Sequence, residues 1–427
     1  MGEETGILHE SIPAPAATGW FPALKPRERR ALVTCWTGWA LDSMDLQMYT
    51  FAIPTLMAAW TLTRAEAGSL ATTSLLMSSL GGWIAGILAD RIGRVRTLQI
   101  TVAWFALFSL LSGFAQSFGQ MFLARGLLGL GFGGEYAVGA VLLSETIRAE
   151  WRGRTLGAMA TASAAGWGTA ALLYTIIFSA LPADMAWRVL FIVGVTPALL
   201  VVVLRRFVSE PEIYRASEVA RAASGVRADP LEIFRPRLLG TTLGCALLAT
   251  GAQGGYFAIT AWLPTFLSQE RGLNVSATGG YVGVTVLGSF FGYLVGAYLS
   301  DRIGRRGTFL LFGVAAFVTV IVYTLVPLGG TMMLMVGFPL GFVASGVFSA
   351  TPSFFSELYP THCRASGLGF VHNFGRGFGA VFPFMVGLLA ERLGLAAAIG
   401  IFAGCAYGLL IVVALMLPET RGRELLS

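Results

Sequence analysis

The sequence is poor in charge, in cysteine and in histidine. Only 12% of its 427 residues are Asp, Glu, Lys or Arg, whereas 55% are hydrophobic. A soluble fold of this size cannot bury so much apolar surface, so the composition excludes a soluble globular protein. The four cysteines, Cys35, Cys245, Cys363 and Cys405, lack metal-ligand spacing, and we expect free thiols, no disulfides and no metal or other cofactor. The sequence also lacks a nucleophile–base constellation and a phosphate-binding loop, which argues against an enzyme.

What the chain has instead is long apolar runs. A membrane-spanning helix needs about 20 mostly apolar residues, and twelve such runs stand between clusters of charged or turn residues. We predict spans at 31–58, 66–89, 97–115, 121–145, 155–181, 187–205, 238–267, 277–300, 307–326, 331–352, 366–390 and 394–417. The predicted fold class is therefore an all-α membrane protein with twelve transmembrane helices.

The 29 Lys and Arg residues are distributed unevenly between alternate loops. Of these, 23 fall in the N-terminus, the even-numbered inter-helix loops and the C-terminus. Lys and Arg accumulate in cytoplasmic loops, which predicts an inner-membrane protein with both termini in the cytoplasm. The net charge of +6 is then a topology signal, and we expect no nucleic-acid partner. Residues 1–30 contain Glu3, Glu4 and Glu10 and no apolar segment, so we predict no cleavable signal peptide.

The chain repeats itself after about 210 residues. The sequence Asp90-Arg91-Ile-Gly-Arg94 recurs as Asp301-Arg302-Ile-Gly-Arg305, and Ser144-Glu145 with Arg152 recurs as Ser356-Glu357 with Arg364. The Pro-Glu pairs at 211–212 and 418–419 close the two copies. A duplication predicts two pseudo-symmetric six-helix bundles. The expected division is a cytoplasmic tail 1–30, a bundle 31–205, a cytoplasmic linker 206–237, a bundle 238–417 and a cytoplasmic tail 418–427.

The doubled motif resembles a known family. Gly86-Ile-Leu-Ala-Asp-Arg-Ile-Gly-Arg-Val-Arg96 is similar to the signature between helices 2 and 3 of the major facilitator superfamily, and its copy to the one between helices 8 and 9. Asp42-Ser-Met-Asp45, Arg125-Gly-Leu-Leu-Gly-Leu-Gly-Phe-Gly-Gly-Glu-Tyr136 and Asn373-Phe-Gly-Arg376 resemble the acid:proton symporters. Aromatic-acid members usually carry Gly where this chain has Ser43, which favours the sialate and lactate branch. The resemblance implies a central cavity between the bundles and a monomer.

Two carboxylates lie near the middle of the first predicted span. A charge inside a span costs about 2.5–3.5 kcal/mol on insertion scales, so each needs a partner or a function. Asp42 and Asp45 are three residues apart and share one face of the helix. Burial favours the neutral form of a carboxyl group, which lets it load and release a proton. We therefore predict proton coupling at this pair; capping of an unwound turn or permanent pairing with an arginine is the alternative.

Arg376 is the first candidate for binding an anionic substrate. It lies near mid-span in helix 11, three residues after Asn373 and one turn after His372. A guanidinium presents a planar fork of donors that matches a carboxylate. The resemblance places Arg376 opposite Asp42 and Asp45. A permanent strut between the two bundles is the alternative role for Arg376, and His372 is either a proton relay or a packed interior residue.

Helix 4 carries two further charges, Arg125 and Glu135. They are ten residues apart, about 15 Å along a helix axis, and so do not pair with each other. The resemblance implies that Arg125 takes part in proton coupling or gating. Glu135 either titrates or pairs with another helix.

Other side chains are candidates for cavity contacts or for gating. Cavity contacts are expected from Gln47, Tyr49, Trp167, Gln253, Tyr256 and Phe370, with helix packing as the alternative for the aromatic residues. Charges at the cytoplasmic surface are expected to form ion pairs that exist while that side is closed. They are Asp90, Arg91, Arg94, Glu145, Arg152, Asp301, Arg302, Arg305, Glu357 and Arg364.

The predicted function is secondary active import of a small organic acid by proton symport with alternating access. A monocarboxylate, a sialate and an aromatic carboxylate all fit, and the partners are the organic anion, protons and the lipid bilayer. Pro418-Glu-Thr-Arg-Gly422 leaves a sugar-porter-like carrier of a neutral metabolite open, and a proton-driven drug exporter is a further alternative. The buried arginine and the aspartate pair favour the acid.

Overall fold

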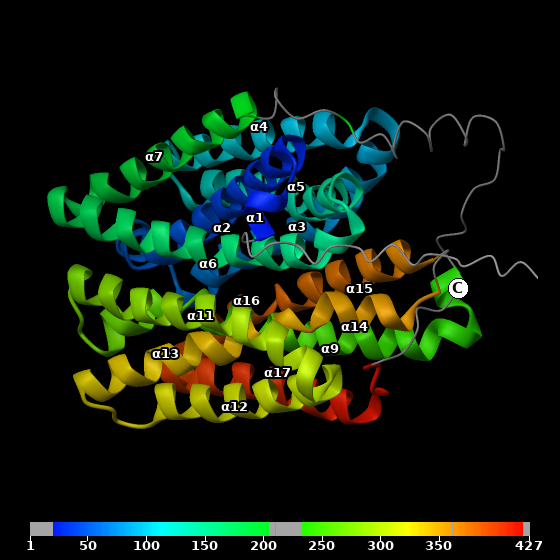
Figure 1. The fold of residues 1–427 in the computed structure, drawn as a ribbon. Helices are drawn as coiled ribbons and strands as arrows, with labels where there is room; N and C mark the ends of the chain where they lie inside the picture. The colour runs from blue at the N-terminus through cyan, green and yellow to red at the C-terminus, as the bar shows by residue number, and fades with distance from the viewer. Residues whose placement is uncertain (1–19, 205–209, 211–231, 361–362, 422–427) are drawn as a thin grey trace, which may run out of the picture.

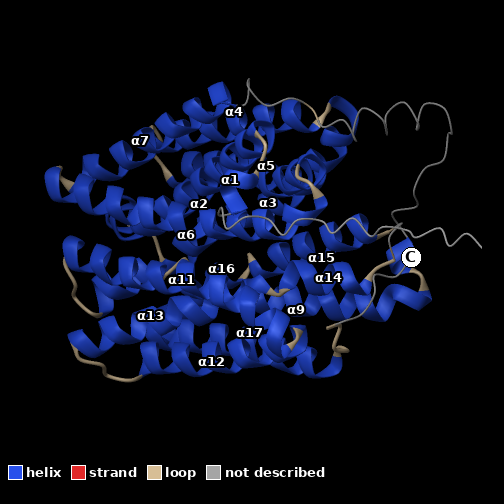
Figure 2. Ribbon diagram, in the orientation of Figure 1, coloured by secondary structure: helices blue, strands red, loops and turns tan. Residues whose placement is uncertain are grey.

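The structure of the chain is a computed structural model that describes residues 20–204, 210, 232–360 and 363–421. Throughout these residues the regular structure is helical (Figure 2). Most of the tail 1–30 and of the linker 206–237 lies outside the described residues, as does the end of the tail 418–427.

The first half of the chain folds into long helices joined by short turns. They are α1 (Trp20–Ala23), α2 (Pro26–Trp60), α3 (Arg64–Ile92), α4 (Arg94–Gly113), α5 (Phe118–Thr146), α6 (Ala149–Ala180) and α7 (Ala183–Leu204). We refer to these helices as the first half.

The second half of the chain is also helical, with shorter pieces between the long helices. It consists of η2 (Glu232–Phe234), α9 (Pro236–Thr260), α10 (Leu263–Thr265), η3 (Phe266–Glu270), α11 (Val275–Ile303), α12 (Arg305–Leu325), α13 (Gly330–Gly346), η4 (Val347–Ser349), α14 (Thr351–Leu358), α15 (Arg364–Gly379), α16 (Phe382–Leu393) and α17 (Leu395–Met416). In Figure 1 this second half lies below the first.

All the predicted spans overlap helices, but three of those in the second half are interrupted. The interruptions separate α9 from α10, α13 from α14, and α15 from α16. Pro264, Pro352 and Pro383 lie in the first turn of the piece that follows each interruption. Proline lacks the N–H that a continuous helix requires and is tolerated in a first turn, so each proline marks a new start.

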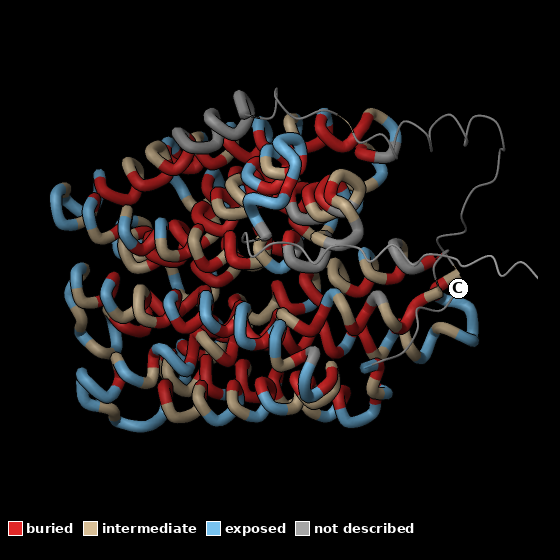
Figure 3. Tube along the Cα trace, in the orientation of Figure 1, coloured by how far each residue is buried: buried red, intermediate tan, exposed pale blue. Residues whose placement is uncertain are grey.

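Eight of the described helical segments are long and apolar enough to cross a membrane. Buried positions lie where helices face one another, and exposed ones line the outside (Figure 3). Large apolar side chains are nevertheless exposed, including Trp83 at 69% and Met416 at 79%. Apolar surface on this scale suits contact with lipid rather than water.

The sequence repeat has a structural counterpart. Gly93 ends α3 with a φ of 102°, and Gly304 ends α11 with a φ of 87°. Glycine adopts such positive φ values without a steric penalty, so both copies of the repeat turn the chain sharply into the next helix. All four cysteines are free thiols, as predicted.

The two halves are joined tightly where α3 begins. The Nη1 of Arg64 donates to the carbonyl of Ala390 at 2.8 Å, and the backbone N–H of Ala65 donates to Glu391 at 3.2 Å. Glu270 lies 4.0 Å from Arg64 and accepts from the first backbone N–H groups of α17. These contacts link α3 of the first half to η3, α16 and α17 of the second.

Candidate functional site

Asp45 on α2 and Arg125 on α5 form a buried ion pair. The Arg125 Nη1 lies 2.8 Å from the Asp45 Oδ2, and neither side chain is exposed. The hydroxyl of Ser109 on α4 donates to the other carboxylate oxygen. A buried ion pair is stable only when hydrogen bonds compensate its desolvation, and Ser109 supplies one of them. From the sequence, pairing with an arginine was the alternative role for this aspartate, and the structure gives Arg125 as the partner.

Aromatic rings surround the arginine of this pair. The guanidinium carbon of Arg125 lies 5.1 Å from the centre of the Tyr49 ring and 5.7 Å from that of Phe191. The Tyr49 hydroxyl donates to the carbonyl of Ala67 at 2.6 Å, which fixes the ring in place. Two nitrogens of Arg125, Nε and Nη2, have no hydrogen-bond partner among the described residues. The rings therefore provide part of the environment that the buried cation needs.

Arg376 reaches from the second half into the first. It lies on α15 with 5% of its surface exposed. Its guanidinium carbon is 6.0 Å from the centre of the Trp39 ring on α2 and 5.3 Å from that of Phe132 on α5. Trp39 stands one helical turn before Asp42, which is 1% exposed. The structure thus brings Arg376 to the part of α2 that carries Asp42, whereas Asp45 pairs with Arg125.

The neighbours of Arg376 on α15 contact both halves. The carbonyl of His372 accepts a hydrogen bond from the Gln253 amide on α9 at 3.0 Å. Asn373 donates to the carbonyl of Gly369, also at 3.0 Å. A side chain at Gly82 on α3 would begin only 2.9 Å from the Asn373 Oδ1, so α3 approaches α15 closely there. Of the predicted contacts, Asn373 and Gln253 therefore lie near Arg376.

Trp167 on α6 contacts Tyr256 on α9 through their side chains. Their ring centres are 6.4 Å apart in an edge-on arrangement, and Tyr256 also packs against Phe348 at 5.5 Å. Ser43 donates to the carbonyl of Ser163 at 2.8 Å. These contacts connect α2 and α6 of the first half to α9 of the second.

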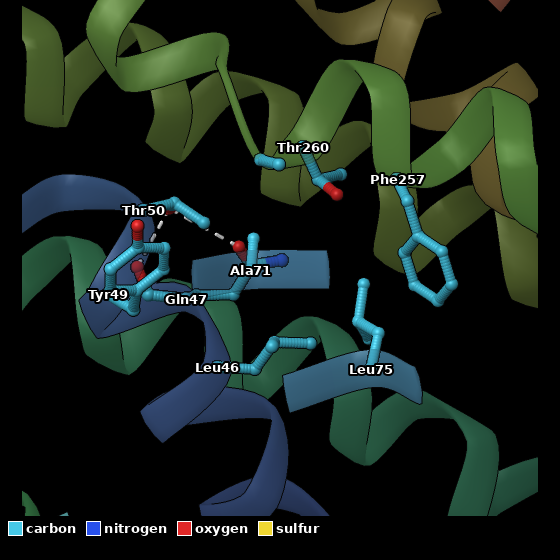
Figure 4. A pocket seen from close by; sticks show the side chains of 9 residues that line it. Leu46, Gln47, Tyr49, Thr50, Ala71, Leu75, Phe257 and Thr260 are labelled. Atoms are coloured by element: carbon cyan, nitrogen blue, oxygen red, sulfur yellow. Dashed lines mark hydrogen bonds between the residues drawn. The ribbon is translucent and has the colours of Figure 1, made fainter. Parts of the chain in front are cut away.

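A small cavity lies between α2, α3 and α9 (Figure 4). Its lining residues are Leu46, Gln47, Tyr49, Thr50, Ala71, Leu75, Phe257, Thr260 and Ala261. Thr50 donates to the carbonyl of Gln47 at 2.8 Å, and the Gln47 side chain projects between the helices. Gln47 and Tyr49 were predicted as cavity contacts. Thr50, Phe257 and Thr260 were not, because no charge or motif distinguishes them in the sequence.

The other predicted residues lie in several parts of the molecule. Glu135 is buried on α5 with 1% exposure, one helical turn after Phe132. Phe370 packs against Phe234 at 4.9 Å, between ring centres, and so serves packing within the second half. Arg91 and Arg302 are exposed, and Arg302 lies over the ring of Tyr298 at 4.6 Å.

Among the predicted gating charges whose side chains are described, two pairs form, each within one half. Arg94 and Glu145 are 3.2 Å apart, and Arg305 and Glu357 are 2.9 Å apart. Each pair joins neighbouring helices of the same half, so neither one bridges the two halves. The side chains of the predicted gating residues Asp90, Arg152, Asp301 and Arg364 lie outside the described residues.

After each copy of the repeated motif, a carboxylate accepts hydrogen bonds from the first N–H groups of the next helix. Glu210 accepts hydrogen bonds from the backbone of Arg94 and Val95, both at 2.9 Å. Glu419 accepts from Arg305 and Arg306 in the same way, at 2.9 and 3.1 Å. Glu210 therefore makes in the first half the contact that Glu419 makes in the second. Glu212, which the sequence matched with Glu419 as the end of a copy, lies outside the described residues. In each half the carboxylate accepts from the free N–H groups at the start of a helix.

Burial alone would raise the pKa of the Glu419 carboxyl group. Four backbone N–H groups, from Arg421, Arg305, Thr420 and Arg306, instead lower its pKa below the ordinary value. A negative charge at the start of a helix also interacts favourably with the helix dipole. Glu419 therefore stays ionised and ties the chain after α17 to the start of α12.

The chain is similar to known membrane transport proteins. The sequence model of the Major Facilitator Superfamily matches residues 35–383. A probable 4-methylmuconolactone transporter of Cupriavidus pinatubonensis is 43% identical over 405 residues, covering 94% of this chain and 93% of the relative. The cis,cis-muconate transport protein of Acinetobacter baylyi is 29% identical over 357 residues, covering 82% and 85%. The crystal structure of a D-xylose-proton symporter matches with a TM-score of 0.74 at 17% identity, covering 92% of this chain and 99% of that one, which is a likeness of fold.

Proposed function

The chain belongs to the Major Facilitator Superfamily and is a transporter rather than an enzyme, and from that premise we propose that it imports a small organic acid together with protons. The observation that carries the proposal is Arg376, a buried arginine that reaches from α15 to α2 and α5. A guanidinium at mid-membrane costs about 2.5–3.5 kcal/mol on insertion scales and is kept where it serves a function. A carboxylate offers it a planar, two-point contact.

The names of two relatives support an acid over a neutral sugar. They describe transport of a muconate and of a methylmuconolactone. Muconate is an unsaturated dicarboxylate, and muconolactone is its lactone with one carboxylate. The xylose symporter shares the fold at 17% identity, and fold alone does not specify a substrate.

The Asp45–Arg125 pair is our candidate for proton coupling. Protonation of Asp45 would neutralise the carboxylate and remove the attraction that holds Arg125 at 2.8 Å. The loss of a buried pairing changes the relative stability of two conformations, which is what coupling requires. Asp42 and Glu135 are further candidates for the titrating group.

The proposal includes an arrangement in the membrane. We propose twelve spans in two six-helix bundles, 31–205 and 238–417, with the tails and the linker 206–237 on the cytoplasmic side of the inner membrane. The eight apolar helical segments and the basic residues of the even-numbered loops support this arrangement. We also propose that the protein is a monomer, because the family resemblance implies one.

Substrate charge is tested by comparing an acid with its uncharged amide. We expect the purified wild type to be stabilised against heat by cis,cis-muconate or benzoate and not by the corresponding amides. Arg376→Ala should lose this stabilisation, and Arg376→Lys should weaken binding about 10-fold or more, because lysine lacks the planar fork. Equal stabilisation by acid and amide would show that the carboxylate is not recognised.

The strut alternative predicts a different result. If Arg376 only joins the two halves, its substitution should lower stability without changing the preference for acid over amide. A neutral replacement of Asp42 combined with Arg376→Ala should then restore the stability.

A further inference from the structure

Trp39 and Phe132 form an aromatic pair beneath Arg376, and neither was among the predicted site residues. Their ring centres are 6.3 Å apart, and the ring planes are inclined by only 21°. The guanidinium carbon of Arg376 lies within 6.0 Å of both centres. The rings come from α2 and α5 of the first half, whereas the arginine comes from α15 of the second.

The backbone of α5 directs the Phe132 ring toward this position. A side chain at Gly133 would begin 1.7 Å from the Ser78 carbonyl on α3, and one at Gly131 would begin 2.8 Å from the Thr101 carbonyl on α4. The glycines on both sides of Phe132 are thus packed against α3 and α4. Phe132 is left to fill the remaining side of α5, where its ring is 7% exposed and meets Arg376.

Aromatic rings support a guanidinium without occupying its hydrogen-bond donors. The negative face of a ring attracts a cation placed over it. The N–H groups of a guanidinium lie in its own plane and point outward from its edges. A ring near the guanidinium therefore attracts the cation and limits its movement without accepting a hydrogen bond from its N–H groups. A neutral support also does not compete with the substrate as an acidic residue would.

We propose that Trp39 and Phe132 are positioning residues that orient the Arg376 guanidinium for a substrate carboxylate. This proposal rests on the proposed function of Arg376. Because the contact joins the two halves, the rings orient the arginine only when α2 and α5 are next to α15. The acid is therefore recognised best in the conformation in which the two halves are in contact at these rings.

The first experiment measures substrate recognition in variants that change the ring. Trp39→Leu and Phe132→Leu should each raise the KM for acid uptake about 5- to 30-fold, which corresponds to the strength of a desolvated cation–ring contact. Trp39→Phe keeps a ring and should stay within about threefold of wild type. Phe178→Leu, which removes a ring packed against Tyr174 on α6, serves as the control for lost packing.

Fluorinated tryptophans at position 39 separate ring electronics from ring shape. Successive fluorine atoms weaken the negative face of the indole with little change in size, so the KM should rise with each added fluorine while the maximal rate and the pH profile stay unchanged. A KM that does not respond to fluorination, or a Trp39→Leu variant with the wild-type KM, overturns the proposal.

A second measurement needs no substrate and keeps this test independent of the proposed function. In a double-mutant cycle on thermal stability, Trp39→Leu and Arg376→Ala should be non-additive, since each removes the same contact. Additive effects overturn the contact between ring and arginine. Non-additive effects without any acid binding by the wild type would leave the contact intact and reject the proposed function instead.

Discussion

At the scale of single residues, the buried pair of Asp45 and Arg125 carries a large cost of desolvation. Both side chains are completely buried, and among the described residues Ser109 alone adds a hydrogen bond to the carboxylate. Removing one partner of such a pair leaves an uncompensated charge and costs about 3–5 kcal/mol, whereas removing both is often nearly neutral. This asymmetry separates a structural role of the pair from a role in proton coupling.

We predict that Asp45→Asn lowers thermal stability strongly and abolishes pH-driven uphill uptake. The double variant Asp45→Asn with Arg125→Gln should regain most of the stability, because no lone charge remains, yet stay inactive in uphill uptake. Thermal unfolding in detergent and uptake into proteoliposomes under a pH gradient measure the two effects. Uphill uptake with normal pH dependence in either variant would place proton coupling at another carboxylate, with Asp42 and Glu135 next.

At the scale of helices, carboxylates hold several helix ends in place. Glu210 and Glu419 bind the first N–H groups of α4 and α12. Glu28, near the start of α2, binds the turn between α5 and α6. It accepts hydrogen bonds from the Arg148 backbone N–H at 3.1 Å and from the Arg148 Nε at 3.0 Å. Each of these carboxylates ties a helix end to a segment distant in sequence.

Glu28 should make stability depend on pH. Burial alone would raise its pKa, but hydrogen bonds from Arg148 and from the Lys25 backbone lower the pKa to about 2, from an ordinary value of 4.5. A lowered pKa in the folded state contributes stability that is present above pH 4.5 and is lost as the pH falls toward 2. We predict that Glu28→Gln is destabilised by about 1–3 kcal/mol at pH 7 and that its difference from wild type shrinks below pH 4.5. Unfolding curves that differ equally at pH 7 and pH 3 would contradict this role.

At the scale of the whole molecule, the two halves are closed at the end where α3 begins. Arg64 and Ala65 of the first half bond to Ala390 and Glu391 of the second. Farther along, Phe384 donates to Thr72 at 3.2 Å. In the proposed topology this end faces outward, so these contacts break when the transporter opens to the outside.

We predict that Arg64→Ala exposes the small cavity to the outside more often. Thr260→Cys, in a chain whose native cysteines are replaced by serine, reports this through labelling with a membrane-impermeant thiol reagent. Labelling should be several-fold faster with Arg64→Ala than without it. Arg188→Ala is the matched control, because Arg188 bonds only to Gly113 and Ala115 of its own half among the contacts described. If the labelling rates of the two arginine variants are equal, the contacts of Arg64 do not control opening to the outside.

The sequence by itself determined where the helices run and which charges are buried. Apolar runs are a property of contiguous residues, so their positions follow from composition alone. The charges predicted inside spans are buried in the structure: Asp42, Asp45, Arg125, Glu135 and Arg376 are all 5% exposed or less. The repeat of Asp90–Arg94 at Asp301–Arg305 likewise ends two helices at glycines with positive φ.

Only the tertiary structure decided which of these residues meet. Asp45 and Arg125 are 80 residues apart, and Arg376 reaches rings on two helices of the other half. Each residue turns a helix by about 100°, so a contact between helices depends on how far each one is rotated and shifted. Packing at positions such as Gly133 against Ser78 sets that rotation. Because this information lies in the fit between distant surfaces, no local pattern in the sequence contains it.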